Sequence, residues 1–198
     1  MKRLSIVGMF FFLCSGLLFG QESAQHEQDS LQYAIVVMLN DVRNNPASFI
    51  PAIDRYRLHV RSFTKNVPAL ETAVKEIKAR LRKERPLPVL NMQGALQFAA
   101  MDHATDITTS GVMGHIGSDS SDPLIRVNRY GLISSLGEAI TYGNNTPELI
   151  IAAFLVDEGT PGRGHRENLL NPIYSLVGVA VGSHAVFGRT CVIVLGAP

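Results

Sequence analysis

The stretch "GHRENLLNPIYSLVGVAVG", residues 164–182, contains the change of pattern that decides the fold. It opens with His165 between a glycine and an arginine, passes a turn signal at Asn171-Pro172, and ends in a run of valine and glycine. A second apolar run, "TCVIVLG", follows a glycine-containing turn around residues 182–188. Two apolar runs on either side of such a turn predict a β-hairpin.

The segments upstream of this hairpin have helical patterns. Apolar residues recur at helical spacing from Leu31 to Val42, and Asn45-Pro46 predicts the start of a second helix, since these residues suit the cap and the first helical position. Another apolar stripe runs through residues 96–107 before Gly111 ends the helix. Helices first and strands late, without regular alternation, predict an α+β fold with an antiparallel sheet.

Two later helices have their own start and stop signals. Ser121 or Asp122 is expected to cap a short helix that begins at Pro123. Thr146 is expected to cap a helix that ends at Gly159.

Residues 62–85 form a basic amphipathic segment. Leu70, Val74, Ile77 and Leu81 share one helical stripe, while most of the lysines and arginines lie elsewhere. The pattern predicts a helix packed on the domain with a solvated basic face. Contact with an anionic surface is the alternative.

The N-terminus has the composition of an export signal. Lys2 and Arg3 precede an apolar run that ends at Phe19 and is shorter than the about 20 apolar residues of a transmembrane anchor. We therefore expect a cleaved signal peptide at residues 1–20, a polar linker at 21–30 and one domain at 31–198. Lipidation of Cys14 is not expected, because Leu13 stands where a small residue would be needed.

Signal removal leaves a near-neutral chain with Cys191 as its only cysteine. An exported chain without a disulfide framework indicates a bacterial protein of the periplasm or the extracellular space, stabilised by its core alone. The charge gives no indication of nucleic-acid binding.

Three glycine-flanked segments hold the polar residues with metal-binding or catalytic potential. They contain His115, Glu138, and the group Asp157, Glu158 and His165. Because glycine lets a backbone turn sharply, we expect loops that present these side chains into a cleft. Two imidazoles and two carboxylates can bind a divalent cation or transfer protons, and the spacing does not choose between these roles. The sequence has no HExxH motif, no paired cysteines and no phosphate-binding glycine loop.

Other polar residues fit structural roles better. Ser118 is a candidate nucleophile close to His115, but the serine-rich turn around it is typical of a helix cap. Cys191 is expected to be a buried small hydrophobe, and His103, on an apolar stripe, a core histidine bonded to a neighbour. Arg166 is expected to fix the local turn by hydrogen bonds.

Four segments, in this order, resemble the CAP superfamily (cysteine-rich secretory proteins, antigen 5 and pathogenesis-related proteins) in its bacterial SCP-like branch. They are "PLPVLNMQGALQFAAMDHATDI", "GHIGSDSSDPLIRVNRYG", "GEAI" and the stretch at 164–182. The resemblance covers roughly residues 31–195. It implies a three-layer α-β-α sandwich with a central antiparallel sheet and a wide cleft.

The resemblance also implies a site. Members of the family carry two histidines and two acids in the cleft, and several bind zinc or another divalent ion through the histidines. In this chain His115 and His165 match the histidines and Glu138 matches one acid. Asp157 stands in the usual place of the second acid, with Glu158 beside it as the alternative. Zinc is the metal that the resemblance favours.

The chain departs from the family pattern at several points. It has Gly-Glu-Ala at residues 137–139 where Gly-Glu-Asn is usual, and Phe154 where tryptophan is common. The disulfides of eukaryotic members are absent, and residues 62–85 look like an insertion. These differences weaken any transfer of eukaryotic activities such as sterol or fatty-acid export.

Three functions remain open. The first is a secreted binding module with a divalent ion and an envelope ligand (lipid, glycan or peptide) or a protein partner. The second is a hydrolase, for example a peptidase, in which a metal or Glu138 with His115 or His165 activates water. The third is a structural or adhesive domain with an unused site. The first is preferred because the histidines are paired with acids and no convincing nucleophile accompanies them.

Overall fold

The structure, a computed structural model, describes the backbone of residues 8–198 and the side chains of residues 26–198. Its sheet is built from the long strands β2 (Ser135–Tyr142), β3 (Leu176–His184) and β4 (Gly188–Ala197). Strand β4 pairs antiparallel with both of the others, while the short strand β1 (Asn91–Met92) adds to β3 in parallel. The order β1-β3-β4-β2 confirms the predicted hairpin and leaves β2 as an edge strand.

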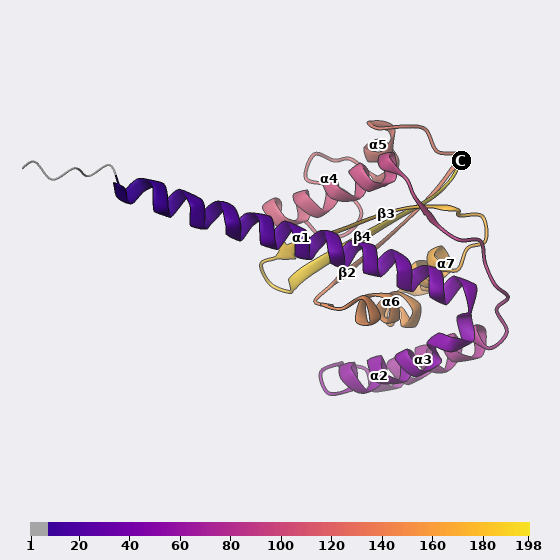
Figure 1. Ribbon diagram of the computed structural model, residues 1–198. Helices are drawn as coiled ribbons and strands as arrows, with labels where there is room; N and C mark the ends of the chain where they lie inside the picture. The colour runs from indigo at the N-terminus through magenta and orange to yellow at the C-terminus, as the bar shows by residue number, and fades with distance from the viewer. Residues whose placement is uncertain (1–7) are drawn as a thin grey trace, which may run out of the picture.

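Helices cover both faces of this sheet (Figure 1). Helices α4 and α5 lie on one face, and α1 and α6 lie on the other, with α2 and α3 packed beyond α6. The expected three-layer α-β-α arrangement is therefore confirmed. The helices are α1 (Gly8–Asn44), η1 (Pro46–Phe49), α2 (Ile50–Arg61), α3 (Val67–Leu81), α4 (Gly94–Ser110), α5 (Pro123–Asn128), α6 (Pro147–Val156), η2 (Pro161–Arg163) and α7 (Gly164–Leu169).

Strand alternation divides the core into two clusters. Val179 and Ile193 pack in the larger cluster with residues of α1, α3 and α6. Ala180 and Val192, next to them along the strands, pack in the smaller cluster with residues of α4. Because successive side chains of a strand point to opposite faces, one hairpin supplies both clusters.

Helix α4 lies directly on β3 at Gly178. A Cβ atom at this position would lie 2.2 Å from the carbonyl carbon of Leu96 and 2.3 Å from the backbone nitrogen of Gln97. The Gln97 side chain also spans the two elements, because its amide donates to the Val179 oxygen at 2.8 Å and its oxygen accepts from the Val179 nitrogen at 3.0 Å. The contact is backbone against backbone, so only glycine fits.

The basic segment folds as a helix packed on the domain, as predicted. In α3 the stripe of Leu70, Val74, Ile77 and Leu81 is buried. Part of its basic face is paired within the domain, since Lys78 contacts Asp54 at 2.7 Å. The Lys78 ammonium group therefore already has a partner within the domain.

The start signals of the later helices are confirmed, but one stop signal is wrong. Asp122 and Thr146 accept hydrogen bonds from the first turns of α5 and α6. Helix α6 ends at Val156, before Gly159, because Asp157 takes the left-handed conformation at φ 52°. Short polar residues tolerate this conformation better than most side chains, and the carboxylate of Asp157 gains hydrogen bonds there.

Residues 21–30, expected to form a linker, continue helix α1. Their glutamines, glutamates and alanine are good helix formers, and adding turns to an existing helix is easier than starting one. The first seven residues of the predicted signal peptide lie outside the described residues. Within the described part of the chain, no helix combines the length and apolarity needed to cross a membrane.

We expect Gly178→Ala to lower the free energy of unfolding by about 2 kcal/mol or more, because α4 would have to move away from β3. Gly94→Ala is the matched control at the start of the same helix, since a Cβ there has nothing within 4 Å. Urea unfolding followed by circular dichroism measures both. Equal stability of the two variants would contradict the close backbone contact.

Candidate functional site

His115 and Glu138 form the first of two imidazole-carboxylate pairs. The Nδ1 atom of His115 lies 2.8 Å from Oε1 of Glu138. The Glu138 side chain is only 2% exposed, whereas that of His115 is 48% exposed. The carboxylate is thus a buried anchor for an imidazole that faces solvent.

The expectation that Glu138 lies in a loop is wrong, because it lies within strand β2. Its backbone is in register with Val194 of β4. By strand alternation the Glu138 side chain shares a face with Ile140, which packs against the α4 layer. His115 does lie in a loop, between α4 and α5.

Arg126 of α5 is the cation that compensates the charge of the buried Glu138 carboxylate. Its guanidinium donates to both carboxylate oxygens, at 2.8 and 3.1 Å, and its side chain is also 2% exposed. It further donates to the His115 oxygen at 3.1 Å and to the Ser121 oxygen at 2.7 Å. Sequence reasoning missed Arg126, although an arginine between Ile125 and Val127 in a short apolar helix is a signal for a buried charge.

His165 and Asp157 form the second pair. Nδ1 of His165 lies 2.8 Å from Oδ1 of Asp157, and the backbone nitrogen of His165 donates to Oδ2 at 2.9 Å. Glu158 instead accepts a hydrogen bond from Thr64 at 2.8 Å. Asp157 is therefore the acid that holds this histidine.

Arg166 fixes the turn between α6 and α7 by hydrogen bonds, as expected. It donates to the backbone oxygens of Leu155 and Val156 at the end of α6, and to Ala73 of α3. The bonds to Leu155 and Val156 satisfy carbonyl groups that the end of α6 leaves unpaired. The position of His165, next in the chain, is thereby tied to two helices.

The two pairs bring the two imidazoles together. The ring centroids of His115 and His165 lie 6.3 Å apart at an interplanar angle of 42°. Each ring directs Nδ1 at an ionised carboxylate, which can only accept, so in the neutral ring Nδ1 carries the proton and Nε2 carries the lone pair. Among the described residues, neither Nε2 atom has a hydrogen-bond partner.

A hollow of about 210 Å³ lies beside His165. Phe154 forms one wall, with its ring centroid 5.5 Å from that of His165, and Tyr56 forms another. Burial, together with the charges of Glu158 and Asp157, raises the pKa of Tyr56 to about 12. The Tyr56 hydroxyl therefore stays protonated and can donate a hydrogen bond to a bound group.

The remaining polar candidates from the sequence do not join the two pairs. Ser118 donates to Asp106 at 2.5 Å. Cys191 is buried in the core, and burial raises the pKa of its thiol. His103 is fully buried and bonds the Gly114 oxygen at 2.8 Å, which confirms the expected core histidine.

We expect Arg126→Met to lower the free energy of unfolding by about 3–5 kcal/mol, because it leaves a buried carboxylate without its cation. Adding Glu138→Gln should recover part of this loss. Arg129→Met is the control, since its side chain is 39% exposed, and a much smaller change is expected there. Urea unfolding of the four chains checks this, and an Arg126 variant as stable as the Arg129 variant would refute it.

The carboxylate of Asp157 makes stability depend on acid pH. Burial alone would raise its pKa, but hydrogen bonds from His165 and Thr160 outweigh burial and hold the pKa below the ordinary 3.8. A carboxyl whose pKa is lowered on folding contributes stability above its unfolded pKa, and that contribution is lost as pH falls through the folded pKa. We expect the stability difference between wild type and Asp157→Asn to be largest near neutral pH and to shrink in this acid range. Unfolding curves across pH measure it, and a difference independent of pH would contradict the mechanism.

Most of this chain is similar in sequence to one known protein family. Residues 52–195 match the pattern of the CAP family, described as the cysteine-rich secretory protein family. The chain is 28% identical over 136 residues to the uncharacterized protein YkwD of Bacillus subtilis, and the match covers 68% of this chain and 51% of the relative. The chain thus spans about half the length of that curated relative.

Solved structures with similarity to this chain include two from bacteria. An outer surface protein of Borrelia burgdorferi is 21% identical with a TM-score of 0.49, over 66% of this chain and 92% of that one. An extracellular SCP-domain protein of Bacillus anthracis is 19% identical with a TM-score of 0.48, over 65% of this chain and 41% of that one. The family match extends over most of the sandwich and includes both imidazole-carboxylate pairs, so this chain belongs to the CAP family of cysteine-rich secretory proteins.

Proposed function

We propose that this protein is an exported binding module that holds a divalent metal ion, zinc in preference, between His115 and His165. The observation that carries the proposal is the arrangement of the two rings. Each Nδ1 atom is held by a carboxylate that is 2% exposed, and the ring centroids are 6.3 Å apart. Export is supported by the signal-like pattern of residues 1–20.

The two imidazole nitrogens are ligand atoms of a type that zinc prefers. Neutral imidazole nitrogen is a preferred zinc ligand, and ligating histidines commonly donate their second ring N–H to a carboxylate. Two imidazoles that share one ion through bonds of about 2.0–2.1 Å have ring centres roughly 5–6 Å apart, so only a small approach of the present rings is needed. The buried carboxylates fix the tautomer and the orientation of the rings in advance.

The number of protein ligands is small. Among the side chains that the structure describes, no group of three or more histidine, cysteine, aspartate or glutamate residues could hold a metal ion. His115 and His165 would therefore be the protein ligands, and water or a bound molecule would complete the coordination. A metal held in this way would supply a Lewis acid for an oxygen of the ligand.

The surroundings of His115 and His165 offer surfaces that suit a ligand. The hollow at Tyr56 and Phe154 offers a hydrogen-bond donor and an aromatic wall next to His165. A second hollow of about 420 Å³ reaches Glu138 and is lined by Leu124, Ile133 and Leu136. An envelope ligand or a partner with apolar groups and a metal-binding oxygen would use these surfaces together.

A hydrolase receives less support from the contacts. Glu138 would have to accept a proton from water, but its two oxygens already take hydrogen bonds from Arg126 and His115 in a buried site. Ser118, the candidate nucleophile, donates to Asp106 instead of a histidine. The contacts suit a fixed binding site better than a group that gains and loses protons.

Zinc titration of the metal-stripped protein by calorimetry tests the proposal. We expect saturable binding of one ion per chain, with loss of the signal in His115→Ala/His165→Ala. His59→Ala is the matched control, because His59 is an exposed histidine whose ring packs against that of Phe63, with the ring centroids 5.4 Å apart. Circular dichroism verifies that each variant is folded.

Two results would overturn this proposal. Wild-type protein that takes up no zinc would exclude a zinc site. Binding that persists in the folded double variant, or that disappears in His59→Ala, would place the ion elsewhere.

A further inference from the structure

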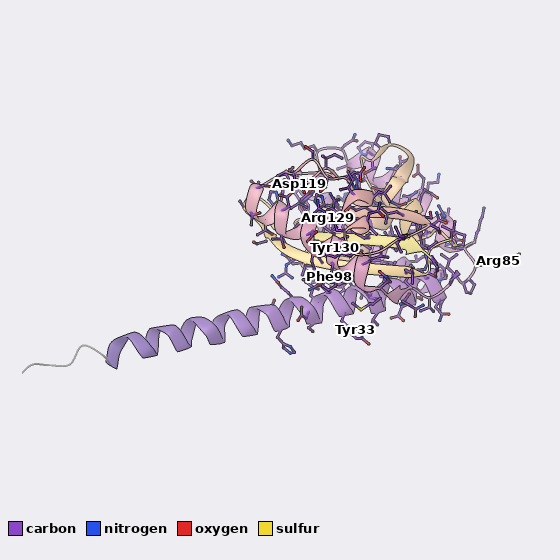
Figure 2. The ribbon with its side chains drawn as sticks, turned by 90° about the horizontal axis from the view of Figure 1, so that it is seen from above. Tyr33, Arg85, Phe98, Asp119, Arg129 and Tyr130 are labelled. Atoms are coloured by element: carbon purple, nitrogen blue, oxygen red, sulfur yellow. The ribbon has the colours of Figure 1, made fainter. Side chains whose placement is uncertain are left out.

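A separate cavity of about 380 Å³ opens between α4 and the segment of residues 118–129. None of the four residues of the two imidazole-carboxylate pairs lines it. Its volume lies within the range of about 300–1,000 Å³ that is usual for small-molecule sites. Figure 2 shows Phe98, Asp119, Arg129 and Tyr130, which lie at or near its rim.

The rim combines an aromatic face with a chain of planar charged groups. The Arg129 guanidinium donates to Asp102 at 3.2 Å and to Asp119 at 2.6 Å. The Tyr130 hydroxyl also donates to Asp102, at 2.8 Å. The ring of Phe98 packs against that of Tyr130 with centroids 5.3 Å apart. Phe98 is 52% exposed, so a large part of its ring remains available to a ligand.

The lining also includes two buried side chains with unused hydrogen-bonding atoms. His103 and Arg126 both line the cavity, and both are at least 98% buried. The Nδ1 atom of His103 and the Nε atom of Arg126 have no hydrogen-bond partner in the described structure. Because Nε2 of His103 faces a carbonyl oxygen and must donate to it, Nδ1 is an acceptor, while Nε of Arg126 is a donor. Both atoms are themselves buried, so they lie behind the wall of the cavity and the groups open to a ligand are those of the rim.

The charges of the cavity disfavour an anionic ligand. Arg129 is paired with Asp102 and Asp119, and Arg126 is paired with Glu138. Asp106 accepts hydrogen bonds from the backbone and the hydroxyl of Ser118. Three aspartates thus face one arginine that is not already paired with Glu138, so an anionic ligand would be repelled, whereas the hydroxyls of a neutral ligand can donate to the remaining lone pairs of the carboxylates. Exposed aromatic surface beside such groups can cover the apolar face of a sugar ring.

We propose that this cavity is a carbohydrate-binding subsite, in which one sugar ring lies against Phe98 and its hydroxyls bond Asp102 and Arg129 at the rim. The ligand class is a neutral saccharide. The subsite is separate from the proposed metal site, although Arg126 contacts both.

Titration of the ¹⁵N-labelled protein with maltose and with the β-1,4-linked disaccharide of N-acetylglucosamine tests this proposal by NMR. We expect saturable shifts, with at least one of the two sugars, in residues 98–106 and 117–130. Phe98→Ala and Asp102→Asn should each weaken binding by about tenfold or more. Tyr33→Ala is the matched control, because Tyr33 is an exposed aromatic residue that does not line the cavity.

Each alternative outcome overturns the proposal. Absence of saturable shifts with both sugars would exclude the subsite, and binding unchanged in a folded Phe98→Ala variant would place the sugar elsewhere. Tighter binding of the amide of Nα-acetyl-lysine than of either sugar would show a site for cations. His115→Ala/His165→Ala should bind sugar as the wild type does, so this result is independent of the zinc titration.

Discussion

Two buried carboxylates determine how the residues around the site are arranged. The side chains of Glu138 and Asp157 are each 2% exposed, and an ionised carboxylate so far from water costs several kcal/mol unless other groups pair with it. Glu138 is matched by the guanidinium of Arg126 and by His115. Asp157 is matched by the His165 ring and by two backbone N–H groups at the start of α7. The hydrogen bond that compensates each buried carboxylate thus also fixes the orientation of its imidazole.

The two pairs come from opposite layers of the sandwich and meet at one edge of the sheet. Glu138 points from β2 toward α5, where Arg126 lies, whereas Asp157 and His165 come from the helices α6 and α7. Strand β2 lies at the edge, and the Asn168 amide of α7 donates to the Glu138 oxygen at 3.0 Å. This contact covers part of a strand edge that would otherwise be open to pairing with another chain. Protection of the edge and construction of the site therefore use the same residues.

Local signals in the sequence predicted the elements that local physics controls. The hairpin, the stripe of α3 and the caps Asp122 and Thr146 depend on neighbours in the chain, and they were found. Strand β2 was missed because its pairing partner β4 lies about fifty residues away, and Gly137 and Glu138 have little preference for strands. Arg126 was missed because a charge in a short helix usually faces solvent. The histidines and acids were identified through the family resemblance, while spacing alone left their role open.

The loop that carries His115 shows why these contacts matter for binding. The imidazole itself is 48% exposed, yet the backbone beneath it is held from three elements. His103 of α4 bonds the Gly114 oxygen, the Tyr142 hydroxyl of β2 accepts from the Gly114 nitrogen, and Arg126 of α5 donates to the His115 oxygen. The exposed His59, by contrast, lies within helix α2 and packs its ring against that of Phe63. A fixed backbone lowers the entropy that binding must remove, so an exposed ring on a rigid support is suited to meet a ligand in one orientation.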